Sequence, residues 1–183
     1  MESSNVCTEK ASYALPSWRV NQIIFFTVHF LSNEGYYKEG FDYQKAIQKK
    51  GIRLKAYSAF KPENLLELQK ISLSLWDEGL CLVTTDDETQ KNCRLIAYND
   101  SKTSVEIMQI IFHEYGHILF EHTEQSPNAE SEATLFSAIA TFLMIAEQQL
   151  HIGQFISLIG GEENFFEGIR EGLMEKFGTK EVA

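Results

Sequence analysis

The sequence predicts a single α+β domain that is mostly helical, with a small mixed sheet of about three strands and a central helix carrying an HExxH motif. A chain of 183 residues with 44% hydrophobic and 23% charged residues is suited to one sizeable core. Short strand-like stretches are confined to residues 51–99, and helical periodicity dominates elsewhere. No repeat or linker-rich tract divides the chain, so we expect one domain over residues 1–183, with N-terminal helices (1–50), a sheet region with one helix (51–99) and a helical region (100–183).

Two helices are expected in the N-terminal part. The segment from Ser17 has helical apolar spacing and a stop signal at Gly35, its apolar side being formed by Val20, Ile23, Ile24, Thr27 and Leu31. A shorter helix follows, with Asp42 as its cap and Gly51 at its end. The most apolar early stretch, Val20 to Leu31, is well short of the roughly 20 residues that a membrane-spanning helix needs.

The middle of the chain predicts three strands and one helix. Alternating apolar positions from Ile52 indicate the first strand. Pro62 suits the start of a helix whose apolar residues continue to Trp76, with Gly79 as its end. Two further strands, LCLVTT and CRLIAYN, are joined by an acidic stretch at 86–88 and are expected to form a hairpin with a long loop.

After Asn99 the chain is expected to be helical throughout. Thr103 and Glu106 form a capping-box pattern at the start of a helix that is apolar on nearly every side, so this helix should be central. A long helix runs from Pro127 to about Leu150, and the pair Gly160–Gly161 separates the final helical segments.

Charge and cysteine content limit the classes of partner and location. The formal net charge of -10 argues against nucleic-acid binding or attachment to anionic lipid. Cys7, Cys81 and Cys93 show no CxxC spacing, which suggests neither a disulfide framework nor a thiolate zinc site. The first ten residues lack the pattern of a secretory signal. We therefore expect a cytoplasmic protein without membrane attachment.

The central helix contains the candidate chemistry, in the sequence His113-Glu114-Tyr115-Gly116-His117. Residues four apart on an α-helix project from one face, so His113 and His117 could share a zinc ion. Glu114 could accept a proton from a water molecule at the metal and deliver it to a leaving amine. Two histidines that are buried in the core and form ordinary hydrogen bonds would explain the same sequence pattern. Burying two histidines and a carboxylate together is, however, unfavourable unless a partner such as a metal ion compensates them.

A hydrolytic zinc site needs a third protein ligand, and three residues are candidates. Glu132 heads an apolar row on the next helix, whereas Glu130 heads a polar row, so helical phase favours Glu132 and leaves Glu130 as the alternative. Both could instead be first-turn carboxylates favoured by the helix dipole. His122 follows His117 by five residues, a spacing that does not match the metzincin pattern; it could line the cleft, or be a surface histidine.

The motifs IAYND, HEYGH and ESEATLFSA together resemble the ImmA/IrrE family of bacterial metallo-endopeptidases, over roughly residues 94–144. This resemblance implies a small zincin-like domain with His113, His117 and Glu132 as zinc ligands and Glu114 as the catalytic carboxylate. The chain departs from the family where it has FLMIAEQQ in place of LLMP after the FA step, and Ser137 in place of the second Ala.

The resemblance also implies the substrate, because members of the family cleave or inactivate helix-turn-helix repressors. We therefore expect a zinc endopeptidase of narrow specificity. The strand from Arg94 to Tyr98 could bind an extended peptide at the sheet edge, with Tyr98 steadying the oxyanion, or could be an ordinary core strand. The alternative function is an anti-repressor type of binding module with a structural or vestigial zinc; a third is a hydrolase of non-peptide amides.

Overall fold

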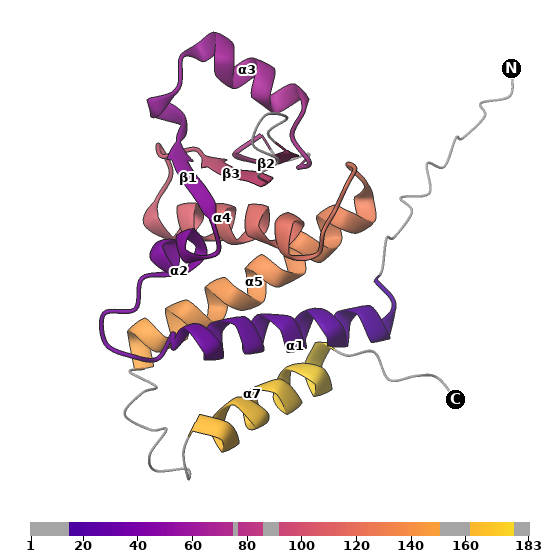
Figure 1. Cartoon of the computed structure of the whole chain (residues 1–183). Helices are drawn as coiled ribbons and strands as arrows, with labels where there is room; N and C mark the ends of the chain where they lie inside the picture. Colours follow the sequence, from indigo (N-terminus) through magenta and orange to yellow (C-terminus); the bar gives the residue numbers. More distant parts are fainter. Residues whose placement is uncertain (1–14, 75–76, 86–91, 151–161, 178–183) are drawn as a thin grey trace, which may run out of the picture.

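The computed structural model describes residues 15–74, 77–85, 92–150 and 162–177 (Figure 1). The predictions that involve Cys7, Trp76, the acidic stretch 86–88 and the pair Gly160–Gly161 lie outside these residues. The described part contains the helices α1 (Ser17–Glu34), α2 (Tyr43–Lys49), α3 (Pro62–Lys70), α4 (Ser104–Leu119), α5 (Pro127–Leu150) and α7 (Glu162–Phe177), the 3-10 turn η1 (Tyr57–Ala59), and the strands β1 (Ile52–Ala56), β2 (Gly79–Thr85) and β3 (Asn92–Tyr98). The predicted fold class, a mostly helical α+β fold with a three-stranded mixed sheet, is confirmed.

The sheet has the order β1-β3-β2. β3 pairs parallel with β1, in a register that joins Leu54 to Ile96, and antiparallel with β2, where Cys81 is opposite Ile96. β3 is therefore the central strand, and the expectation that residues 94–98 form a sheet edge is wrong. Both sides of β3 already have a partner, so a peptide could not add to this strand as a further strand.

Four helices are stacked in layers on one side of the sheet, and α3 lies on its other side (Figure 1). Figure 1 shows α4 between the sheet and α5, with α1 below α5 and α7 below α1, and residue contacts support each of these neighbours. The main core lies along this stack, where its largest fully buried side chains include Phe112, Phe136, Ile23 and Ile111. The predicted central position of the HExxH helix is therefore confirmed.

Local signals placed most helix ends correctly. Gly35 ends α1 with φ 71, a left-handed conformation that glycine adopts easily. Asp42 caps α2 by accepting a hydrogen bond from the Lys45 N–H. Thr103 and Glu106 form the predicted capping box of α4.

α3 is shorter than the sequence predicts. It ends at Lys70 instead of continuing to Trp76, and Ile71 is its C-cap. Beyond this point the Leu73 N–H donates to the Cys81 carbonyl of β2, 3.2 Å away, while the Gln125 side chain donates to the carbonyls of Ser72 and Ser74. These long-range hydrogen bonds hold the segment against β2, and they outweigh the helical pattern of its apolar residues.

α5 is long and apolar enough to span a membrane by length and composition, with a mean hydropathy of 1.3 over the relevant window. Half of that window is buried inside the fold, which is typical of the core helix of a soluble protein. Its partners there are α4 and α1.

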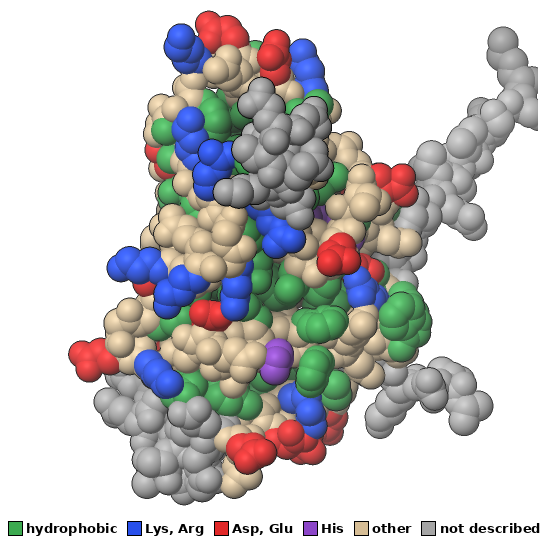
Figure 2. Space-filling model, viewed as in Figure 1, with side chains coloured by type: hydrophobic (Ala, Val, Ile, Leu, Met, Phe, Trp, Pro, Cys, Tyr) green, Lys and Arg blue, Asp and Glu red, His purple; other side chains and the backbone are tan. Residues whose placement is uncertain are grey.

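Basic side chains gather on one part of the surface. Figure 2 shows Lys and Arg over the region where α2 and β1 lie in Figure 1, and the exposed basic residues of that region are Lys45, Lys49, Lys50, Arg53 and Lys55. The net charge of -10 is therefore not spread evenly over the surface.

Candidate metal centre

The two histidines of the HExxH motif lie side by side on α4 as predicted. Their ring centroids are 5.0 Å apart and their Nε2 atoms 3.2 Å apart. His113 is 2% exposed and His117 is not exposed at all. Burial lowers the pKa of His117 to about 4, and the neighbouring His113 acts in the same direction, so His117 is neutral at pH 7 with one ring nitrogen free to accept.

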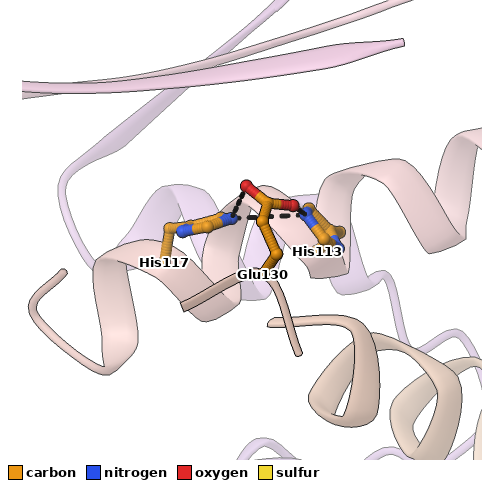
Figure 3. A group of neighbouring side chains, drawn as sticks. All are labelled: His113, His117 and Glu130. Carbon is orange, nitrogen blue, oxygen red and sulfur yellow. Dashed lines mark hydrogen bonds and ion pairs between the residues drawn. The ribbon is translucent and has the colours of Figure 1, made fainter. Parts of the chain in front are cut away.

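Glu130, in the first turn of α5, completes a group of three possible metal ligands. Its Oε2 is 3.2 Å from His113 Nε2, and its Oε1 is 3.5 Å from His117 Nε2 (Figure 3). One potential ligand atom from each residue lies within 4.8 Å of the other two. Two imidazole nitrogens and one carboxylate are a donor set used by catalytic zinc sites, so the residues fit this metal.

The structure differs from the sequence-based choice of Glu132 as the third ligand. The residues it brings together are His113, His117 and Glu130, while Glu132 pairs with Arg19 and His122. The polar row headed by Glu130 was expected to face away from the core, but its later members Ser137 and Thr141 are buried. The buried face of α5 is wide because the helix packs between α4 and α1, and the two glutamates lie on its opposite borders.

Glu114 is fully buried beside this group. Neither of its carboxylate oxygens makes a hydrogen bond of ordinary geometry, and burial raises its pKa to about 8, while weaker contacts with Cys81 and Ser74 oppose the rise only in part. Gly79 of β2 makes room for it, since a Cβ at that position would lie 2.7 Å from Glu114 Oε1. A buried, poorly hydrogen-bonded carboxyl group whose pKa is near neutrality is suited to accept and return a proton.

His122 packs against His117 on the side of the ring that carries Nδ1. The two Nδ1 atoms are 2.9 Å apart, and His122 Nε2 is 3.0 Å from Glu132 Oε2. Glu121, with φ 55, reverses the chain at the end of α4, and the His122 N–H donates to the His117 carbonyl. Both ring nitrogens of His122 face protein groups, so the predicted contact of His122 with a substrate finds no free nitrogen here.

Tyr98 lies at the end of the central strand β3. It is half-buried, packs against the main hydrophobic core, and pairs with Gly79 and Ala56 in the sheet. This position matches the alternative interpretation of an ordinary core strand with a packing tyrosine. A role of Tyr98 in steadying an oxyanion stays a prediction.

No protein-family model, curated protein or solved structure matches the chain. The resemblance to the ImmA/IrrE family therefore depends on the three short motifs, and the candidate site depends on the geometry of its own residues.

Sequence reasoning missed two residues that shape the site. Arg19 of α1 binds Glu132, which lies 113 positions later in the chain, and a contact at that separation leaves no local pattern. Gly79 was interpreted only as the end of a helix, although it opens the space that Glu114 fills. A glycine at the start of a strand could have indicated a close approach, because glycine is unfavourable inside strands unless space requires it.

Proposed function

We propose that this protein is a zinc-dependent endopeptidase of narrow specificity, with His113, His117 and Glu130 as the metal ligands. The observation that carries the proposal is the fully buried, poorly hydrogen-bonded carboxyl group of Glu114 beside a His-His-Glu group. A purely structural zinc site needs only ligands, and a carboxyl group kept in this state is unfavourable unless it has a chemical role.

In the proposed hydrolysis of a peptide bond, the metal and Glu114 have different roles. When bound, zinc would act as a Lewis acid toward the scissile carbonyl and lower the pKa of a water molecule. Glu114 accepts a proton from the attacking water and returns it to the nitrogen of the leaving amine. A pKa near neutrality suits both steps, because a much weaker base would not accept the proton effectively and a much stronger one would not give it up.

The proposed substrate is a helix-turn-helix repressor, which follows from the resemblance to the ImmA/IrrE family. The charge of the chain supports a protein of this type, since a net charge of -10 favours association with a basic DNA-binding protein. Such association should weaken as salt concentration rises.

The test measures zinc and cleavage separately. Elemental analysis should find one zinc per chain in the wild type and in Glu114→Gln, and none in Glu130→Ala. Candidate repressors incubated with the zinc-loaded protein should yield two fragments by mass spectrometry with the wild type and none with Glu114→Gln. Cleavage retained in Glu114→Gln, or a wild type without zinc after metal-replete expression, would refute the proposal.

One observation favours the alternative, a binding module of the anti-repressor type with a structural zinc. The ligand side chains are largely enclosed, with exposures of 3% for His113, 0% for His117 and 20% for Glu130. A nearly closed site limits the access of a peptide. A repressor that binds the zinc-loaded protein tightly but stays at full length would support this alternative.

A further inference from the structure

We propose that Glu132, held by Arg19, is a positioning residue that acts through His122 to fix which nitrogen of His117 faces the metal. This inference rests on the proposed function, because it assigns a role to residues that surround the same metal group. It also gives Glu132 a function other than the ligand role expected from the sequence.

The four residues form a continuous chain of contacts from α1 to the metal group. Arg19 Nε donates to Glu132 Oε1 over 2.7 Å, and a second guanidinium nitrogen contacts Glu132 Oε2. Glu132 Oε2 is 3.0 Å from His122 Nε2, and His122 Nδ1 is 2.9 Å from His117 Nδ1. His117 Nε2, on the other side of that ring, faces His113 and Glu130.

Donor and acceptor roles along this chain have one consistent solution for neutral histidines. An ionised Glu132 has no proton to donate, so His122 Nε2 must carry the proton between them. His122 Nδ1 is then an acceptor, and His117 Nδ1 must be the donor to it. His117 Nε2 is left with a free lone pair, which points toward His113 and Glu130.

Arg19 keeps Glu132 in the state that this solution requires. Two nitrogens of the Arg19 guanidinium contact both carboxylate oxygens of Glu132, and such a two-point contact stabilises the ionised carboxylate. The guanidinium is itself fixed, since it lies 4.9 Å above the Phe120 ring and contacts Gln22. The side chains of Arg19 and Glu132 are only 17% and 13% exposed, so solvent competes little with their contact.

The arrangement is more than an ordinary ion pair between α1 and α5. A pair that served stability alone would not need His122 between Glu132 and His117. A ligand histidine commonly donates its second ring N–H to a neighbour that fixes the orientation of the ring. Here that neighbour is a second histidine, and its own orientation depends on Glu132.

The first test measures the His117 tautomer in the metal-free protein. Two-bond 1H–15N correlation spectra at neutral pH should show the proton of His117 on Nδ1 and that of His122 on Nε2 in the wild type. In Glu132→Ala the His122 preference should be lost. A wild-type spectrum with the His117 proton on Nε2 would overturn the proposal, and this readout needs neither zinc nor a substrate.

The second test measures zinc affinity by competition with a chelator. Glu132→Ala should weaken zinc binding by about 10- to 100-fold, as for other residues that orient a ligand. Glu132→Gln should lose less, because its amide oxygen can still accept from His122, and it serves as the second variant if Glu132→Ala does not fold. Glu124→Ala removes an exposed carboxylate from the connection before α5 and is the matched control, with an affinity within twofold of the wild type.

The outcomes separate this inference from the proposed function. Zinc affinity unchanged in Glu132→Ala but lost in Glu130→Ala would overturn the positioning role and leave the metal site intact. Cleavage retained in Glu114→Gln would overturn the proposed enzyme and leave the positioning role intact. A wild type without zinc affinity would overturn both.

Discussion

Replacement of Gly79 by Ala is expected to destabilise the protein and to disturb Glu114. A Cβ at this position would lie 2.7 Å from Glu114 Oε1, 2.8 Å from Ile110 Cγ2 and 2.9 Å from Glu114 Cγ. All three distances are shorter than ordinary van der Waals contact, and both neighbours belong to α4, which is held by the sheet above and α5 below. The backbone of Gly79 does not have positive φ, so the effect is steric.

Overpacking of this kind lowers the free energy of unfolding by about 1–3 kcal/mol. For a chain of this size, each kcal/mol lowers Tm by about 2–4 °C. Urea unfolding of the metal-free protein measures the change, at constant m value. Gly172→Ala is the matched control: no atom lies within 4 Å of a Cβ there, and α7 should gain up to about 1 kcal/mol of helix propensity. A Gly79→Ala variant as stable as the wild type would refute the reasoning.

Three further changes have defined outcomes. In metal-free protein, Glu114→Gln should be more stable than the wild type, and the difference in free energy of unfolding should grow by up to about 1.4 kcal/mol per pH unit from about pH 4.5 to 8. The reason is that the Glu114 carboxyl group has a raised pKa in the folded state, so in this pH range the unfolded wild type releases a proton that the folded wild type keeps. His117 titrates in both proteins and does not affect the difference, and a difference that urea unfolding finds to be independent of pH would contradict this prediction. Thr103→Ala removes the capping box with Glu106 and should lower the free energy of urea unfolding by about 0.5–2 kcal/mol, whereas no change would show that the cap is unimportant. Gly35→Ala places a side chain at φ 71 and should lower the same quantity by about 1–2 kcal/mol; a rise would mean that the end of α1 rearranges.

The parts of the fold that the sequence predicted correctly are those governed by neighbouring residues. The capping box of α4 and the left-handed end of α1 depend on side chains within a few positions of each other. The pairing of the HExxH histidines on one face likewise follows from helix geometry alone. These features needed no knowledge of how the helices pack.

The predictions that the structure contradicts concern features that depend on how distant elements pack together. Glu130 and Glu132 are both suitable ligands by type, and only the positions of α4 and α1 against opposite borders of α5 assign one to the metal group and the other to Arg19. The early end of α3 depends on the Leu73 hydrogen bond to β2. The central place of β3 depends on a parallel pairing with β1, whose partner residues are far apart in the sequence.

The candidate ligand group and the Arg19–Glu132 contact that lies behind it differ in the length of chain that must be ordered to form them. His113 and Glu130 are 17 residues apart, whereas Arg19 and Glu132 are separated by 113. Closing the longer loop requires about 1.7 kcal/mol more entropic free energy. Folding should therefore assemble the three ligands from an α4–α5 hairpin first and add α1 afterwards. If the three residues bind zinc as proposed, zinc added during refolding would find them assembled before the Arg19 contact exists.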